Sequence, residues 1–521
     1  MATVGRRRNR LRRENGQMQM RTSLSTIGLA LLLASLSLPL AIAAEALPKG
    51  RAALFDDDEP AATPAEAGSR EALFGEDQPA RPSAAEPPRS RDSLFGGDDL
   101  QSSAVAAAGT AAIASPPVVK GFVQNRMAYA WPKPSHWSEM MNHFDLSAQG
   151  SLSSNVKWKL GARVDYDAVY SLTDFYPQSV ENDQRFNFLL RENYLDIGAD
   201  NWDFRFGRQQ IVWGEMVGLF FGDVVSAKDV RHFVLPEFEI LRIPQWAARA
   251  EYFKDDFHAE FLWIPLASYD NIGKPGAEFF AYTPPPPPGF QTFFLNERFP
   301  SSSLSNTNYG LRLSILRDGW DVAAFAYSSM SAAPTFYRQV INNPQPTVVY
   351  EARHKRIDQF GSTLAKDFGS VVLKAEAVYT RGRGFELSNF GNLNDNDGVV
   401  EQNVLAWVVG VDYNEIADTR INVQLFQQHI FDRNPDIIPE SNENGYSLLV
   451  NHKFGDKVEA QALWIASLNR SDWMLRPRVS WNFEKNWRAA LGVDIFHGPP
   501  LGYFGRYDDK DRVYTELRYS F

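Results

Sequence analysis

The chain has 521 residues, no cysteine, 13% aromatic residues and a formal net charge of −10 at pH 7. The absence of cysteine excludes disulfides and thiolate metal sites, and the acidic balance argues against a nucleic-acid partner. A mean hydropathy of −0.33 excludes a bundle of membrane helices but is compatible with a membrane barrel, in which only alternate residues face lipid.

The first 44 residues are typical of a secretion signal. Seven arginines lie between Arg6 and Arg21, and an apolar stretch runs from Ile27 to Leu40. This stretch is short for a membrane span, so a membrane anchor is the weaker alternative. Ala41-Ile42-Ala43 then supplies the small residues that a signal peptidase requires. The sequence therefore predicts a signal peptide over residues 1–44.

Residues 45–117 have the composition of a disordered arm, rich in Ala, Pro, Ser, Asp and Glu. The pattern Arg-x-x-Leu-Phe-x-x-Asp occurs in it three times, beginning at Arg51, Arg70 and Arg91. One interpretation is the duplication of a linker. The other is a docking arm, in which three Leu-Phe pairs bind a periplasmic or inner-membrane partner and the repetition raises the avidity. The partner-binding residues of this hypothesis are Leu54, Phe55, Leu73, Phe74, Leu94 and Phe95.

From residue 118 onward, apolar residues alternate with charged ones at period 2, which indicates strands with two different faces. Val156, Trp158 and Leu160 share one face of such a strand, and Lys157 and Lys159 share the other. A soluble antiparallel sheet can also alternate. Here, however, the polar faces carry charges of both signs, and aromatic residues collect at strand ends, where a membrane interface favours them. The pattern therefore predicts an all-β fold, a transmembrane antiparallel β-barrel over residues 118–521.

The barrel is expected to have eighteen strands, with sixteen as the alternative. The connections between them alternate between short and long, as in outer-membrane barrels with tight periplasmic turns and long outer loops. The predicted strands are 118–131, 141–152, 155–169, 185–199, 202–213, 245–254, 256–266, 306–317, 319–330, 354–368, 370–381, 402–414, 417–430, 444–454, 457–468, 473–484, 487–497 and 510–521.

The chain ends in an alternating strand whose apolar face is Leu517, Tyr519 and Phe521. We expect this strand to be the signal that the outer-membrane insertion machinery reads. An even strand count brings both ends of the barrel to the periplasmic side. The predicted location is therefore the outer membrane of a Gram-negative bacterium, with outer-membrane lipid around the barrel and the arm in the periplasm.

The segment from Phe206 to Glu215, FGRQQIVWGE, is followed by DVVSAKD at 223–229. These two stretches resemble the hallmark of a Gram-negative outer-membrane family of unknown function. The resemblance covers the barrel region and rests on the Gly-Arg-Gln…Trp-Gly-Glu motif, and it extends more distantly to the alginate-export barrels. It implies passage of hydrophobic molecules, often alongside inner-membrane exporters. The family usually has Asn-Pro where this chain has Ser226-Ala227, which weakens the transfer of pore-loop details.

Residues 214–244 form the third predicted outer loop, which carries more apolar residues than a loop in water usually does. We expect it to fold into the lumen as a constriction, and an outer cap or partner surface is the alternative. Arg208 lies just below this loop, with Glu215 or Asp223 as its expected partner, and structural pairing is favoured over substrate binding. The candidate pore residues are Arg208, Gln209, Trp213, Glu215, Phe220, Phe221, Asp223 and Asp229.

The predicted lumen carries charges of both signs, which argues against strong anion selectivity. A polar lumen also suits water-soluble cargo better than the lipid-like cargo that the resemblance implies. No metal-ligand spacing or catalytic motif is recognisable, so we expect no enzyme activity, metal or cofactor. The predicted function is an outer-membrane channel or transporter for small or hydrophobic molecules. The alternative is an outer-membrane binding or scaffold protein with a plugged lumen.

Overall fold

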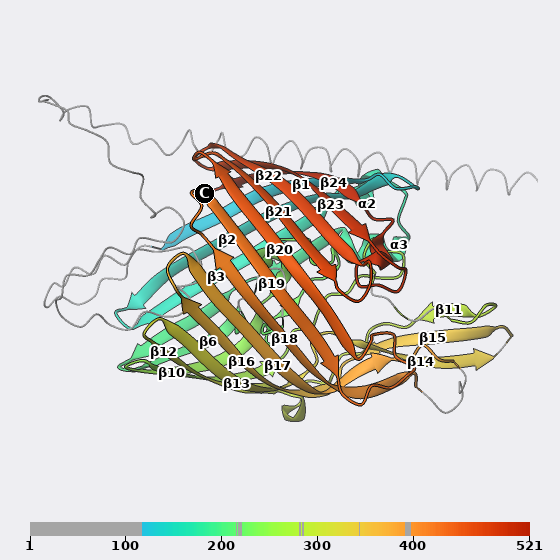
Figure 1. Ribbon diagram of the computed structural model, residues 1–521, viewed down its shortest axis with the longest axis horizontal. Coiled ribbons are helices and arrows are strands. Elements are labelled where there is room, and N and C mark those ends of the chain that lie inside the picture. Colours follow the sequence, from blue (N-terminus) through green and yellow to red (C-terminus); the bar gives the residue numbers. More distant parts are fainter. Residues whose placement is uncertain are drawn as a thin grey trace, which may run out of the picture. The chain divides into compact units, whose positions relative to one another are not determined.

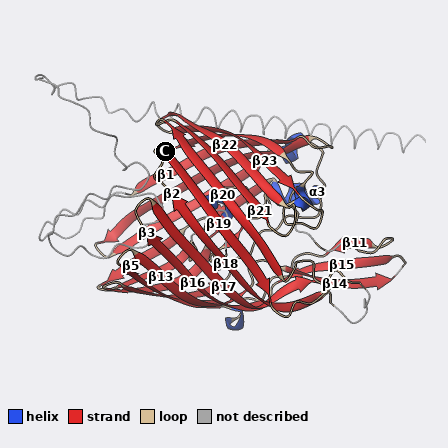
Figure 2. Cartoon of the chain, in the orientation of Figure 1, coloured by secondary structure: helices blue, strands red, loops and turns tan. Residues whose placement is uncertain are grey.

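The computed structural model describes residues 117–521, except 215, 217–220, 281–282, 284–285, 343 and 391–396. The predicted signal peptide and nearly all of the predicted arm lie outside the described residues. The described chain forms one closed barrel of tilted strands (Figure 1). Strands make up most of its regular structure, and the helices are short (Figure 2).

Each barrel strand pairs antiparallel with its neighbours, and β1 pairs with β24 to close the ring. β4 and β5 both pair with β3 and together fill one position, so the 19 strands of the sheet make eighteen positions. The predicted eighteen strands are confirmed. The barrel strands are β1 (Val118–Ala130), β2 (His136–Ser153), β3 (Val156–Asp167), β4 (Phe186–Leu190), β5 (Asn193–Ala199), β6 (Trp202–Gln209), β9 (Gln245–Lys254), β10 (Phe257–Leu266), β12 (Asn308–Arg317), β13 (Trp320–Met330), β16 (Arg356–Asp367), β17 (Val371–Glu386), β18 (Val399–Tyr413), β19 (Thr419–Ile430), β20 (Asn442–Phe454), β21 (Val458–Ser467), β22 (Trp473–Glu484), β23 (Trp487–His497) and β24 (Arg512–Ser520).

Short turns join the strands at one end of the barrel, the short-turn end, where β1 begins and β24 finishes. The turn between β12 and β13 is Asp318-Gly319, and both residues have positive φ, 51° and 75°. This backbone matches the twist of two antiparallel strands, which is why Asp-Gly is common in tight hairpins. The long connections lie at the opposite end, the loop end.

The two faces of the barrel wall differ sharply in chemistry. Along β12, the side chains of Tyr309, Leu311 and Leu313 are exposed, whereas those of Arg312 and Ser314 are buried. Other strands repeat this alternation, so the outward face is apolar and the inward face is polar. Such a wall is expected of a barrel that is surrounded by lipid. Among the described residues, no helix is long and apolar enough to cross a membrane.

Aromatic side chains form a continuous row near the short-turn end. The ring centroids of Trp481 and Phe483 are 5.2 Å apart, those of Phe483 and Trp487 6.1 Å, those of Trp487 and Tyr519 4.9 Å, and those of Tyr519 and Phe521 6.1 Å. Amphipathic rings favour the boundary between lipid and water. The row therefore marks one edge of the apolar belt.

The sequence prediction missed a second sheet at the loop end. It consists of β11 (Gln291–Phe294), β15 (Pro346–Arg353) and β14 (Thr335–Asn342), and it projects beyond the barrel (Figure 1). β11 pairs with β15 in parallel across more than fifty residues of chain, a contact that no local pattern indicates. The remaining elements, also in loops, are α2 (Val169–Leu172), α3 (Gln178–Gln184), α4 (Phe238–Leu241), β7 (Ala227–Lys228), β8 (Arg242–Ile243) and the 3-10 turns Leu304–Asn306 and Gly505–Tyr507.

Candidate functional site

The connection between β6 and β9, residues 210–244, enters the barrel and is called the third loop below. Its first part lies against β10 and β12. Trp213 is 1% exposed, and its Nε1 donates a hydrogen bond to Glu260 Oε1 at 3.1 Å. Arg312 Nη1 donates to the carbonyl oxygen of Trp213 at 2.9 Å. Because Glu260 and Arg312 are on the inward face of the wall, this part of the loop is in the lumen.

Further along, the third loop contacts β17 and β19. The backbone N–H of Gly222 donates to Glu376 Oε2 at 2.9 Å, and the rings of Phe221 and Phe426 are 5.9 Å apart. The chain returns close to itself here, since a Cβ added to Gly214 would lie 2.5 Å from the carbonyl carbon of Gly222. Only glycine permits so close an approach of two backbones.

The returning part of the third loop lies against other strands of the barrel. Arg476 of β22 donates to the carbonyl oxygen of Leu235 at 2.7 Å. Arg163 of β3 donates to that of Ile240 at 3.3 Å, and Arg191, which follows β4, donates to that of Arg242 at 2.8 Å. The third loop is thus held from several sides of the wall, mostly by arginines that bind its carbonyl oxygens.

Glu237 of the third loop forms ion pairs with three arginines of the barrel wall. Arg478, Arg488 and Arg518 lie 3.2, 2.8 and 3.3 Å from its carboxylate. Burial would raise the pKa of Glu237, but the three arginines outweigh that effect and hold its pKa below the usual range. Arg478 and Arg488 also contact Glu516, at 3.1 and 2.9 Å, so the charges of this cluster largely balance.

Two predicted acidic site residues, Asp223 and Asp229, bind arginines of the third loop itself. Arg242 Nε donates to Asp223 Oδ2 at 2.9 Å, and Arg231 Nε donates to Asp229 Oδ1 at 2.8 Å. Burial acts to raise the pKa of Asp229, but the adjacent Arg231 guanidinium outweighs it and lowers that pKa. In this arrangement both carboxylates hold the loop's own fold together.

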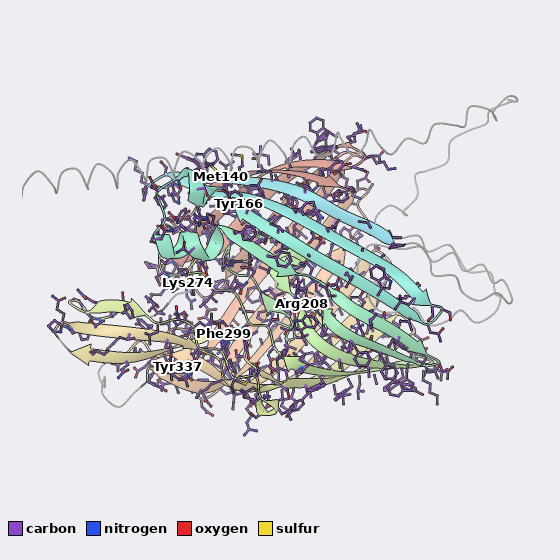
Figure 3. The ribbon with its side chains drawn as sticks, turned by 180° about the vertical axis from the view of Figure 1, so that it is seen from behind. Met140, Tyr166, Arg208, Lys274, Phe299 and Tyr337 are labelled. Carbon is purple, nitrogen blue, oxygen red and sulfur yellow. The ribbon has the colours of Figure 1, made fainter. Side chains whose placement is uncertain are left out.

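The expected pairing of Arg208 with Asp223 is wrong. β6 pairs with β9 without a break in register, which places Arg208 opposite Trp246 and on the face of Phe206. Phe206 is 47% and Trp246 37% exposed, so this is the outward face of the wall, and Figure 3 labels Arg208 on that wall. Strand alternation gives Gln209 the inward position instead, where it is fully buried and its Nε2 donates to the carbonyl oxygen of Ala247 at 3.1 Å.

The remaining predicted residues divide into two groups. Trp213 and Phe221 lie in the third loop at the contacts given above. Glu215, Phe220 and the six arm residues Leu54, Phe55, Leu73, Phe74, Leu94 and Phe95 lie outside the described residues. Sequence reasoning missed the contacts of the third loop with Glu376, Phe426 and Arg476, although alternation alone already gives these three positions an inward face.

A cavity of about 960 Å³ lies beside the third loop at the loop end of the lumen. Phe221 and Val224 of the third loop line it together with inward residues of β16 to β21 and parts of the outer loops. Another cavity, of about 30 Å³, lies among Arg126, Arg163 and Arg231 and is also lined by residues of the third loop. The third loop thus borders two cavities of very different size. Within the described part of the chain, no group of three or more His, Asp or Glu could hold a metal ion.

A family model described as "Protein of unknown function (DUF1302)" matches residues 139–521. No curated protein matches the chain. Similar solved structures include OccAB1 of Acinetobacter baumannii, with 8% identity and a TM-score of 0.49, covering 78% of this chain and 96% of that one. OccK9 (OpdG) of Pseudomonas aeruginosa has 11% identity and a TM-score of 0.46, with 78% and 97% covered. A loop-deletion mutant of OmpT, an outer membrane protein of Vibrio cholerae, has 10% identity and a TM-score of 0.39, with 78% and 99% covered.

Proposed function

Because the chain belongs to the DUF1302 family, whose function is unknown, the barrel itself has to indicate a role, and we propose that it is an outer-membrane channel or transporter for small or hydrophobic molecules. One observation carries this proposal: a closed barrel with an apolar exterior keeps a cavity of about 960 Å³ in its lumen. A wall of this kind suits the outer membrane of a Gram-negative bacterium. Transport through it requires no catalytic group.

In this proposal the third loop is the constriction. Phe221 and Val224 line the cavity from the third loop, and the backbone N–H of Gly222 between them binds Glu376 of the wall. A solute entering from the loop end would meet this segment before it reached the short-turn end. Trp213, Phe221 and Asp223 then act on the pore indirectly, by holding the third loop in position.

Single-channel conductance in planar bilayers tests the constriction. Residues 215–221 can be deleted with little strain, because Gly214 and Gly222, which flank them, already touch. We expect the deletion to raise the conductance, since it removes Phe221 from its contact with Phe426. A matched control shortens the turn between β14 and β15, which projects outside the barrel, and should leave the conductance unchanged. Equal conductance of the loop-deleted and full-length proteins would contradict the constriction.

The alternative function, a binding or scaffold protein with a plugged lumen, is favoured by one observation. The cavity among the charged side chains of β1 to β3 and the third loop measures only about 30 Å³. A protein that shows no open steps at any voltage, before and after deletion of residues 215–221, would support the scaffold and refute the channel.

The arm carries the proposed partner contact. Each Leu-Phe pair, at Phe55, Phe74 and Phe95, would enter an apolar groove of a periplasmic or inner-membrane partner, and three copies would add avidity to weak single contacts. Such a partner could pass cargo to the barrel. A pull-down from native membranes with all three Phe replaced by Ala should lose the partner that the unaltered chain retains. Retention of every partner by the triple variant would leave the repeats as a duplicated linker.

A further inference from the structure

A β-bulge turns the side chain of Arg383 into the lumen. β17 pairs with β18 in one register up to Thr380, opposite Val404, and the register then shifts by one residue so that Arg383 is opposite Gln402. Gly382 occupies the bulge with a φ of 77°, which glycine adopts without strain. An extra residue reverses the alternation that follows it. Without the bulge, Arg383 would be on the lipid face.

Arg383 lines the 960 Å³ cavity, and its side chain is exposed to that space. Its Nη1 donates to Gln428 Oε1 at 3.1 Å, and its guanidinium carbon is 5.1 Å from the centroid of the Phe385 ring. The charged group that acts on Arg383 in the same cavity is the carboxylate of Glu386. The carboxylate of Glu386, three residues on, accepts a hydrogen bond from the backbone N–H of Phe336 at 2.9 Å.

Three other charged groups of the cavity bind partners of opposite charge or backbone donors, whereas Arg506 donates to the carbonyl oxygen of Gly502 at 2.9 Å. Arg470 lies 2.6 Å from Glu443, and Lys355 lies 2.6 Å from Glu401. Asp472 accepts backbone hydrogen bonds from Tyr503, Phe504 and Gly505 at 2.7, 2.9 and 2.8 Å. Arg383 differs from these groups, because the side chain that it hydrogen-bonds is a neutral amide. The Glu386 carboxylate acts on it electrostatically but is bound to the backbone of Phe336 and also interacts with Arg506.

Apolar side chains surround this charge. Phe385, Val378, Val404 and Phe426 line the same cavity from the wall, and Phe221 lines it from the third loop. A volume of about 960 Å³ matches a small-molecule site of the usual range of about 300–1,000 Å³. A ligand that fits has one anionic head group for the guanidinium and an apolar body for the aromatic rings.

We propose that the cavity is a binding site for amphipathic carboxylates. Arg383 binds the carboxylate head group of the ligand, and Phe385 and Phe426 contact its apolar part. The proposal rests on the proposed transport function, for which it names the class of cargo. Binding can be measured without any conductance, so the two proposals can fail separately.

The test is calorimetric titration of the full chain in amphipol with octanoate, and with octanol as the uncharged probe of equal length. Arg383→Gln should weaken octanoate binding by about 10-fold or more, the usual worth of a hydrogen bond to a charged group, and leave octanol binding unchanged. Phe426→Ala should weaken the binding of both probes. The matched control is Arg381→Gln, since Arg381 carries the same charge two residues away but does not line the cavity.

Each outcome decides the proposal. Selective loss of octanoate binding in Arg383→Gln, with Arg381→Gln unaffected, supports it. Equal losses in the two arginine variants, or no loss in either, overturn the role of Arg383. Failure of the unaltered protein to bind octanoate overturns the site, whereas open conductance steps in that same preparation would leave the channel standing. Heat-modifiable migration in electrophoresis verifies that every variant has folded.

Discussion

At the scale of single residues, Glu237 explains how a loop is held inside a polar lumen. A buried carboxylate is costly unless it is paired, and here three arginines from β22, β23 and β24 converge on it. Each of these strands contributes an inward-facing charge that alternation already specifies. The loop is thereby attached to the part of the wall that closes the barrel.

Glu237 predicts how the third loop responds to pH. Its folded-state pKa is lowered from the ordinary 4.5, so its contribution to stability is fully present above pH 4.5 and is lost as the pH falls through the lower, folded-state pKa. Asp229, whose pKa is also lowered, acts in the same direction. We expect the part of the conductance and open-channel noise that depends on Glu237 to stay constant as the pH falls from neutral to 4.5 and to change only below it.

The matched variant is Glu237→Gln, which keeps the shape of the side chain and removes its charge at every pH. It should show at neutral pH the noise that the unaltered protein shows only in acid. A change between pH 7 and pH 5 in the difference between the unaltered protein and Glu237→Gln would contradict this account, because a carboxylate with a lowered pKa does not titrate there. Burial lowers the pKa of His232, which moves the titration of this imidazole away from neutral pH.

At the scale of elements, small departures from regular strands decide which side chains reach the lumen. The bulge at Gly382 turns Arg383 inward, whereas the unbroken register of β6 leaves Arg208 outward. The closing pair of strands uses another close approach. Gly121 and Phe521 exchange two backbone hydrogen bonds of 2.9 Å, and a Cβ on Gly121 would lie 2.8 Å from the Phe521 ring and 2.4 Å from the carbonyl oxygen of Asp145.

This closing contact predicts two assembly defects. Deleting Phe521 removes both hydrogen bonds and the last ring of the aromatic row, so we expect a lower yield of folded barrel, consistent with the proposed reading of this strand by the insertion machinery. Gly121→Val should be equally harmful, since its Cβ meets backbone. Folded yield is measured by heat-modifiable migration after insertion into liposomes. Full yield from both variants would show that closure does not depend on this contact. The control is Gly198→Ala, because a Cβ at Gly198 would meet only the Asp203 side chain, at 3.3 Å.

At the scale of the complete barrel, the membrane requires backbone N–H and C=O groups to be paired within the protein, and a closed ring of strands meets this requirement. Closure of β1 on β24 leaves no free edge in the ring that these two strands complete. Outside that ring the apolar belt determines where lipid lies, and inside it the third loop determines how much space remains. The proposed transport function depends on both conditions together.

The apolar belt predicts that a charged residue on the outer wall destabilises the barrel more at the middle of the belt than at its edge. Leu311 is near the middle of β12 and Ile315 is near its short-turn end, and both side chains are exposed on the outward face. Leu311→Arg should lower the free energy of unfolding in liposomes by about 2–4 kcal/mol and Ile315→Arg by about 0–1 kcal/mol, because lipid penalises charge most at its midplane. Equal costs at the two positions would contradict the placement of the belt.

The barrel, the number of its strands and the position of Phe521 at the closing pair could be predicted from the sequence, because alternation and turn chemistry are local properties of the chain. The course of the third loop, the sheet of β11, β14 and β15 and the lumen position of Arg383 became apparent in the folded protein. These depend on contacts between distant parts of the chain: Arg476 and Leu235, for example, are 241 residues apart. No local pattern specifies such a pairing, because many inward-facing charged residues could bind the carbonyl oxygens of the third loop. The geometry of the closed wall determines which of them do.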